Sequence, residues 1–208
     1  MGRVEQRRAG VIDAIVAAAT EVMAEGGAAS LSLGEVARRL GMRTPSLYGY
    51  FDSRAALCDE VFRRGWLSYA QTTADLHVTA TTDFRAMLRD GILESVRWAN
   101  DNRAAAELMF WRPIPHWQPS ADAFAAAIRA VGQTVQLLHE ARAVGLLRAD
   151  ADVTEMSELL GVIVAGVISQ QLSNEPGVPP EEGRISCHAD AFADLFTSRY
   201  ATQPGSRP

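Results

Sequence analysis

The sequence predicts an all-α protein in two parts: three short helices within residues 1–52, then a helical bundle within residues 53–208. Alanine is abundant and β-branched runs are short, which favours helix over strand. Apolar residues recur three and four positions apart along most of the chain, as on the buried face of a helix. A hydrophobic content of 48% in 208 residues allows a sizeable core.

Charge is distributed unevenly. The net charge is −5, yet residues 1–65 hold nine arginines against eight acids, and residues 32–54 hold four against two. An acidic body with a local basic face suits a site-specific DNA binder better than a non-specific polycation. Every basic residue is arginine. Any phosphate contact must therefore come from arginine, backbone N–H groups or hydroxyls.

Other classes of protein receive little support. Cys58 and Cys187 match no metal spacing, and residues 1–25 are too acidic for a secretory signal, so we expect a reducing cytoplasm. The strongly apolar run at 159–168 is too short to span a bilayer. The four histidines are scattered, and no hydrolase or phosphate-loop motif is present. We predict no enzyme, no cofactor and no metal.

The first helix is expected over residues 8–25, ending at the glycine pair 26–27. Its predicted apolar stripe consists of Val11, Ile12, Ile15, Val16, Ala19, Val22 and Met23. Residues 1–8 carry Arg3, Arg7 and Arg8 against Glu5. They are open to two interpretations: a disordered tail, or a basic arm that touches phosphates or a minor groove.

The segment 32–54 predicts two short helices joined by a tight turn. Ser32 and Glu35 have the spacing of a capping box, and Gly41 stands where a left-handed residue ends the first helix. Thr44 is expected to cap the second helix, with Pro45 at its first position. The apolar positions that should face inward are Leu33, Val36, Ala37, Leu40, Leu47 and Phe51.

The residues left outside on the second helix are basic, hydroxyl-bearing or aromatic, and none is acidic: Arg43, Thr44, Ser46, Tyr48 and Tyr50. One interpretation is a helix-turn-helix whose second helix enters the major groove of DNA. The other is an ordinary helical hairpin in a bundle, because such hairpins are common.

This segment resembles the DNA-binding signature of TetR-family transcriptional repressors. The motif L-x-x-V-A-R-R-L-G-M is followed by T-P-S-L-Y-G-Y-F-D-S-R, and the family pattern falls on Leu47, Tyr48, Tyr50, Phe51, Arg54 and Leu57. Two positions depart from it. Arg54 replaces the usual lysine and keeps its charge, whereas Gly49 lowers helix propensity and removes one possible contact. The resemblance covers residues 8–60.

From the resemblance we expect base edges or adjacent backbone to be reached from Arg43, Thr44, Ser46 and Tyr50. Phosphates would be held by Ser32, Tyr48 and Arg54, and phosphate contacts set the register on DNA. Pro45 and Gly49 lie between these residues and are added to them. The predicted DNA-binding set is therefore Ser32, Arg43, Thr44, Pro45, Ser46, Tyr48, Gly49, Tyr50 and Arg54.

The rest of the chain predicts more helices. Asp52 or Ser53 caps one that continues past Leu67, and no flexible spacer separates it from the segment before it. A conformational change in the helical bundle could therefore pass directly to the DNA-binding segment. Further helices are expected at 84–102, 103–111, 120–145, 154–174 and 184–200, with proline-containing loops at 112–119 and 175–183.

Three hypotheses compete for the body: a small-molecule sensor, a plain dimerisation scaffold and an enzyme. The sensor is suggested by aromatic and methionine residues with a few polar tips, a composition typical of ligand cavities and also of ordinary cores. TetR-like bodies bind ligands that loosen DNA binding, and these candidates carry little charge, so we expect a lipophilic or aromatic ligand. The candidates are Trp66, Tyr69, Trp98, Met109, Phe110, Trp111, His116, Trp117, Phe124 and His139.

Dimerisation is suggested by the helix at 154–174, which is apolar over more than one face. The alternative is burial inside one protomer. The resemblance implies a four-helix interface from the last two long helices, and the predicted contacts are Leu160, Ile163, Val164, Val167, Phe192 and Phe196. The combined prediction is a cytoplasmic homodimeric repressor without membrane association. It would bind a palindromic double-stranded operator and be released by a small-molecule effector.

Overall fold

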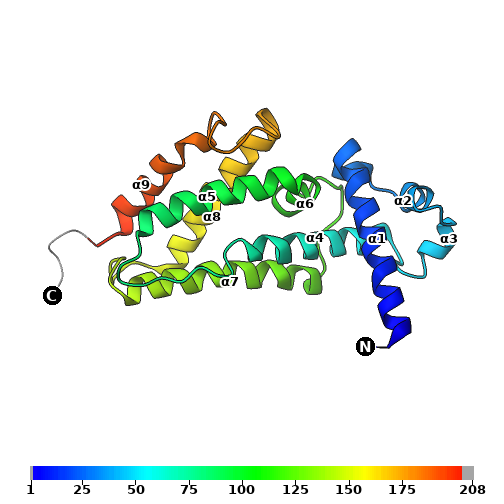
Figure 1. The fold of residues 1–208 in the computed structure, drawn as a ribbon, viewed down its shortest axis with the longest axis horizontal. Coiled ribbons are helices and arrows are strands. Elements are labelled where there is room, and N and C mark those ends of the chain that lie inside the picture. Colours follow the sequence, from blue (N-terminus) through cyan, green and yellow to red (C-terminus); the bar gives the residue numbers. More distant parts are fainter. Residues whose placement is uncertain (1, 203–208) are drawn as a thin grey trace. The chain divides into compact units, whose positions relative to one another are not determined.

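The computed structural model describes residues 2–202, and this part of the chain is helical, as predicted (Figure 1). A single antiparallel bridge, between Leu147 and Ala201, is the β-type pairing present in the described residues. The helices are α1 (Arg3–Gly26), α2 (Leu33–Arg39), α3 (Thr44–Leu47), α4 (Arg54–Gln71), α5 (Phe84–Asp101), α6 (Arg103–Ala106), α7 (Ala121–Ala143), α8 (Val153–Asn174) and α9 (Ala189–Tyr200).

The chain packs as two compact units. The first contains the described residues up to Trp66 together with Asn102–Ala127. The second contains Leu67–Asp101 and the described residues from Ile128 onward. By packing, the chain thus divides within α4 and α7. The predicted division near residue 52 concerns DNA binding and sensing, and it stays a prediction.

Helix α1 begins earlier than expected. It starts at Arg3, so the alternative of a disordered tail is wrong for residues 3–8. Met1 of that tail lies outside the described residues. The predicted apolar face is buried at Ile15, Val16, Ala19, Val22 and Met23, and Gly27 ends the helix with a φ of 78°.

Helix α2 has both expected ends. Its Ser32 hydroxyl accepts the Glu35 N–H at 3.1 Å, and Gly41 adopts a φ of 63°. The Gly41 and Met42 N–H groups then satisfy carbonyls of the last turn, as in a Schellman motif. The second bond of the predicted capping box, from the Ser32 N–H to the Glu35 carboxylate, is replaced. The Glu35 carboxylate instead accepts from Arg38 and Arg39, because a charged donor three or four residues away outcompetes a neutral N–H.

Helix α3 starts one residue before the predicted position. Arg43 is the N-cap, and its carbonyl accepts the Ser46 N–H at 2.8 Å. The prediction that Thr44 caps the helix is therefore wrong, since Thr44 is already the first helical residue. Pro45 follows within the first turn, where its missing N–H leaves no bond unmade. After Leu47 the chain continues as hydrogen-bonded turns to Phe51. Leu47 and Phe51 face inward, as predicted.

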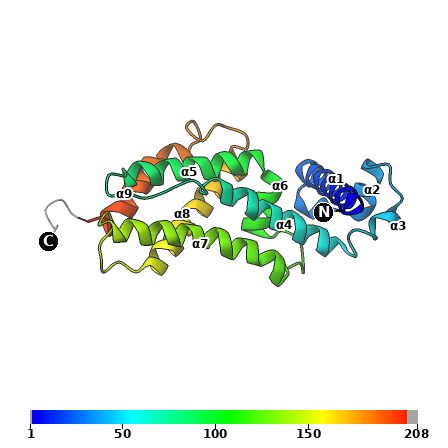
Figure 2. The same cartoon turned by 60° about the horizontal axis from the view of Figure 1, so that its bottom comes forward.

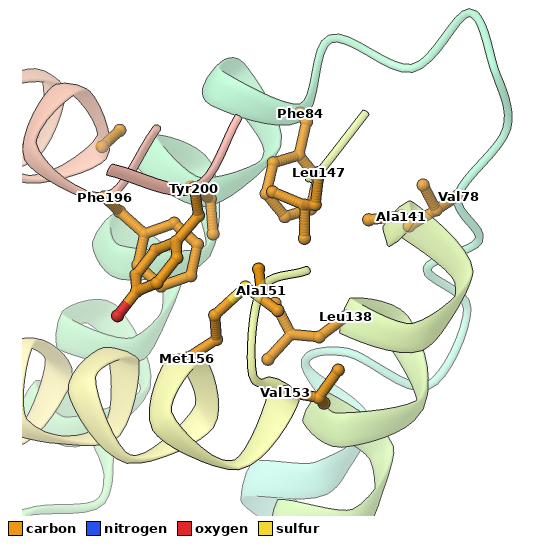
Figure 3. Close-up of a cluster of buried hydrophobic side chains, with 12 residues drawn as sticks. Val78, Phe84, Leu138, Ala141, Leu147, Ala151, Val153, Met156, Phe196 and Tyr200 are labelled. Carbon is orange, nitrogen blue, oxygen red and sulfur yellow. The ribbon is translucent and has the colours of Figure 1, made fainter. Parts of the chain in front are cut away.

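The second unit has its core where α5, α7, α8 and α9 meet (Figures 1 and 2). Figure 3 shows Phe84, Leu138, Met156, Phe196 and Tyr200 converging there. The Phe196 and Tyr200 ring centroids lie 5.0 Å apart. The Tyr200 hydroxyl donates to Glu155 at 2.7 Å, which ties α9 to the first turn of α8.

Helix α9 begins at Ala189 rather than at the predicted position 184. The residues before it are held in a loop by a buried polar group. Gln171 of α8 donates to the carbonyls of Glu175 and Val178 and accepts from the Ser186 hydroxyl at 2.9 Å. These bonds satisfy the amide within the protomer, so the loop serves as structural support for the end of α8.

Helix α8 is more apolar than the sequence pattern suggested. An 18-residue window has a mean hydropathy of 1.3, so the helix is long and apolar enough to cross a membrane by length and composition alone. One such helix is weak evidence for a membrane protein, and α8 packs beside α5 and α9. Only 22% of the window is buried within the chain. Much of an apolar helix is therefore left uncovered by the protomer.

Candidate DNA-binding and partner surfaces

The outer face of α3 and the following turn is a polar surface. Arg43, Pro45, Ser46 and Gly49 are exposed, and Tyr48 is 53% exposed. Two further predicted residues, Thr44 and Tyr50, are half-buried. The structure thus brings hydroxyl, guanidinium and phenol groups together on one face. Of the predicted DNA contacts, Ser32 lies at the exposed start of α2, where its hydroxyl already accepts a backbone N–H.

Two of the four arginines in this region serve the domain's own structure. Arg38 donates to Glu35 at 2.7 Å, and Arg39 pairs with Glu25 and Glu35. These bonds, those from Arg38 above all, lower the pKa of Glu35 to about 2. The basic face inferred from residues 32–54 is therefore smaller than the arginine count implied.

The other two arginines differ from each other. The Arg54 Nη2 donates to the Ala29 carbonyl at 2.8 Å, while its buried Nε has no partner among the described residues. The Arg43 side chain is exposed, and its guanidinium makes no hydrogen bond or ion pair with the part of the chain that the structure describes. Arg43 is thus the arginine of the segment that is most available to a polyanion.

One residue outside the segment joins this surface. The Arg8 Nη2 of α1 donates to the Gly49 carbonyl at 3.0 Å. Its guanidinium carbon lies 5.0 Å from the centroid of the Tyr50 ring, a cation–π distance. The sequence indicated a basic N-terminal segment but carried no signal for this pairing, because the residues are 41 positions apart.

The predicted ligand residues are divided between the two units. The second unit contains Tyr69, Trp98 and His139, and the first contains Trp66, Met109, Phe110, Trp111, His116, Trp117 and Phe124. Phe62, which was not predicted, lies at the centre of the first group. Its ring centroid is 6.3 Å from Trp66, 5.8 Å from Trp117 and 6.5 Å from Phe124.

Several members of the first group are held rigidly. The Trp117 Nε1 donates to Asp59 of α4 at 3.0 Å. Met109 is buried against Gly65, where a β-carbon would lie 2.7 Å from its sulfur. Met109 belongs to a π-helical turn, Glu107–Trp111, and such turns are frequent at functional sites. By contrast, Trp111 and Phe124 are 37% and 40% exposed.

The loop after this turn has an unusual backbone. Arg112 and His116 have φ values of 47° and 60°, in the left-handed region of the backbone that residues other than glycine rarely occupy. The Arg112 guanidinium lies 5.7 Å from the Phe124 ring centroid. His116 is exposed.

The smaller group in the second unit is an aromatic pair with polar tips. The Tyr69 and Trp98 ring centroids are 5.1 Å apart, and both polar atoms bond serines. The Tyr69 hydroxyl lies 2.9 Å from the Ser95 hydroxyl, and the Trp98 Nε1 donates to Ser68 at 3.1 Å. Burial raises the pKa of Tyr69. His139 is exposed on α7 and lies near Arg142.

The predicted dimer residues fall into two classes. Val167 and Phe196 are 2% and 1% exposed, so they pack within the protomer, the alternative that the sequence left open. The partly buried residues are Leu160, Ile163, Val164 and Phe192. Three large apolar residues of α8 and α9 are exposed in the single chain: Leu159 at 37%, Val162 at 69% and Leu195 at 66%.

The described residues were also compared with the requirements of a metal site and of a reactive thiol. In residues 2–202, no group of three histidine, cysteine or acidic residues is placed to hold a metal ion. Cys58 is buried in α4, where desolvation raises the pKa of its thiol to about 11 and keeps it protonated. Cys187 is exposed.

Comparison with known proteins decides the family. Residues 15–61, from the middle of α1 into α4, match the model of the tetR family of bacterial regulatory proteins. The chain belongs to the TetR family. This match spans the helix-turn-helix and excludes the ordinary helical hairpin. Comparison with curated proteins gave no match.

Solved structures share the TetR-like fold over nearly the whole chain. A protein of unknown function from Rhodococcus sp. RHA1 is 20% identical, with a TM-score of 0.73 over 92% of this chain and 95% of its own. The transcriptional regulator FadR from Bacillus subtilis, in complex with stearoyl-CoA, is 14% identical, with a TM-score of 0.68 over 89% and 97%. The TetR-family regulator PfmR from Thermus thermophilus is 20% identical, with a TM-score of 0.64 over 88% and 96%.

The predicted fold class and family are thereby confirmed. TetR-family regulators are transcription factors rather than enzymes, so the enzyme hypothesis for the body is excluded by family membership. The chain is therefore described as a TetR-family transcription regulator.

Proposed function

We propose that this TetR-family regulator is a cytoplasmic repressor that binds a palindromic operator as a homodimer and is released by a lipophilic or aromatic effector. The observation that carries the DNA-binding part is the exposed outer face of α3. Arg43, Ser46 and Tyr48 are exposed there, while Leu47 and Phe51 anchor the same segment in the core. A rigidly held helix with a polar outer face can enter a major groove without distorting its own domain.

Homodimerisation is supported by the uncovered apolar surface of α8 and α9. Leu159, Val162 and Leu195 are exposed in the single chain, and a second copy offers the same surface in return. Two reading heads related by a two-fold axis match a palindromic site. The family's use of its last two long helices supports the same assignment.

The effector part is supported by the aromatic residues of the first unit. Phe62, Trp66 and Trp117 form a ring-against-ring group, and Phe124 extends it toward solvent. Such groups favour apolar ligands. The structure of FadR from Bacillus subtilis in complex with stearoyl-CoA supports a lipophilic effector for this chain by analogy. The effector must favour a conformation of the dimer that binds DNA less well.

Selection from randomised DNA duplexes tests the DNA-binding proposal. The wild-type protein should enrich a short palindrome and bind it about a thousandfold more tightly than random DNA. Tyr48→Ala should weaken binding, with Gln133→Ala, exposed on α7, as the control. If the wild type enriches no sequence, site-specific regulation is excluded.

Tryptophan fluorescence tests the effector proposal. Fatty acids and small aromatic compounds are titrated into the wild type and into Trp111→Phe, a change at an exposed position. Trp117 is a poorer probe because its replacement also removes the bond to Asp59. At least one compound should both bind and release the selected duplex. If none does so, the scaffold hypothesis, with DNA binding but no ligand, replaces the sensor.

A further inference from the structure

We propose that Arg8 is a positioning residue for DNA recognition, which acts by holding Tyr50 and the end of the α3 segment in place. This inference rests on the proposed DNA-binding function. Arg8 contacts the segment twice, through the bond from its Nη2 to the Gly49 carbonyl at 3.0 Å and through its stacking on Tyr50.

The segment needs an external support. Regular α-helix ends at Leu47, and the Gly49 and Tyr50 N–H groups bond only three residues back, at 3.3 and 2.9 Å. Gly49 also brings greater backbone freedom than any other residue. A charged donor on the Gly49 carbonyl therefore immobilises the part of the segment with the weakest intrinsic preference for one conformation.

The stacking contact determines where the Tyr50 ring lies. A guanidinium over the face of a ring restricts the side chain to one rotamer and leaves the hydroxyl free to point away. Tyr50 is half-buried and Arg8 is exposed, so the contact closes one side of the ring. The family motif places this tyrosine among the DNA contacts, which makes its orientation relevant to recognition.

A different role would be direct phosphate binding by Arg8, whose remaining N–H donors face solvent. The two roles predict different couplings. A positioning residue loses its effect when Tyr50 is absent, whereas a phosphate contact keeps its effect and contributes to the salt dependence.

A double-mutant cycle on the selected duplex separates these roles, using Arg8→Ala, Tyr50→Ala and the double variant. Arg8→Ala should weaken specific binding about tenfold in the wild type, from a lost charged hydrogen bond and a lost cation–π contact. In the Tyr50→Ala background the same change should weaken binding less than about threefold. Arg7→Ala removes the neighbouring exposed charge and should have the smaller effect in the wild type.

Arg8→Lys is the second variant, because it keeps the charge and loses the planar, forked donor. It should bind the duplex more weakly than the wild type while melting at the same temperature. Equal losses from Arg8→Ala in both backgrounds, with a salt slope lowered by about one, would overturn positioning in favour of phosphate binding. An unchanged affinity in Arg8→Ala would overturn both. Failure of the wild type to enrich any DNA would instead count against the proposed function.

Discussion

The outward faces of α3 and α8 contrast in chemistry. On α3 and the residues that cap it, the exposed positions include Arg43, Ser46 and Tyr48, whose polar groups water can satisfy. On α8 they include Leu159 and Val162, which water does not favour. Both surfaces are candidates for binding, but a polar face is stable alone and an apolar face is not. From this contrast we expect α3 to bind its partner, DNA, reversibly and α8 to stay bound to its partner, a second copy of the chain.

The two partners should also respond differently to salt. Contacts between arginine and phosphate release counterions, so DNA affinity falls steeply as salt rises. Burial of a valine or leucine side chain contributes about 1.5–3 kcal/mol and depends little on salt. A two-fold axis presents each such residue twice. We therefore expect the dimer to persist at salt concentrations that dissociate DNA.

The largest effect is expected from Val162→Asp. Val162 is 69% exposed in the single chain, so the carboxylate is harmless in a monomer, but in a dimer it would be buried without a partner. Dimer association should weaken by about a hundredfold or more, from a cost of roughly 3–5 kcal/mol. Sedimentation of the folded protein measures this.

Two variants make that result specific. Val4→Asp introduces the same charge at another exposed valine, on α1, and should leave the dimer intact. Phe196→Asp buries the charge inside the protomer core and should unfold the second unit. A folded, undiminished dimer in Val162→Asp would remove α8 from the interface.

A smaller effect is expected from Gly161→Ala and Gly166→Ala. In the single chain a β-carbon at either position meets nothing within 4 Å. Each change should therefore stabilise an isolated helix by about 0.5–1 kcal/mol. If a second α8 packs against these glycines, the same change should weaken association instead.

Gly132→Ala on α7 is the matched control, because it also meets open space. It should raise the melting temperature by a few degrees and leave association unchanged. Chemical denaturation and sedimentation of the three variants separate stability from dimerisation. Identical behaviour in all three would show that no helix approaches α8 at its glycines.

The smallest effect concerns pH. The folded pKa of Glu35 is about 2, below its ordinary value of 4.5, because it accepts from Arg38 and Arg39. Its contribution to stability is therefore fully present above pH 4.5 and is lost as pH falls toward 2. Glu35→Gln should flatten the acid limb of the stability profile in that window.

Thermal melting between pH 2 and 6 measures this limb for the wild type and Glu35→Gln. Glu182→Gln, at an exposed acid outside the helices, is the control and should follow the wild type. The α2 variant should be less stable at neutral pH and nearly equal to the wild type at pH 2. A parallel limb in Glu35→Gln would show that the ion pairs of α2 do not contribute in solution.

The same contrast marks what the sequence could predict. The ends of α2 follow from local chemistry at Ser32 and Gly41, and the inward positions Leu47 and Phe51 follow from helical spacing. Such signals lie within a few residues of what they determine. Family membership could be inferred for the same reason, because the motif is contiguous.

Features that depend on distant residues could not be predicted. The pairing of Arg8 with Tyr50 and the bond from Arg54 to Ala29 join separate elements. Apolar periodicity identified α8 and α9 as packing helices, but Phe196 is buried and Leu195 exposed, and no local signal separates the two. No sequence motif or spacing marks a ligand-binding residue in this chain, so the ligand candidates could be chosen only by residue type.

Hydroxyl-radical footprinting of the dimer, with and without the selected duplex, tests the account most directly, because it reads both surfaces in one experiment. The probes are Tyr48, 53% exposed in the single chain, and Leu195, 66% exposed. We expect Leu195 to be protected in the dimer before DNA is added and to stay so. Tyr48 should be oxidised readily in the free dimer and protected severalfold by the duplex. Protection of Leu195 by DNA, with Tyr48 left reactive, would contradict the assignment of α3 to DNA and of α8 and α9 to the second copy.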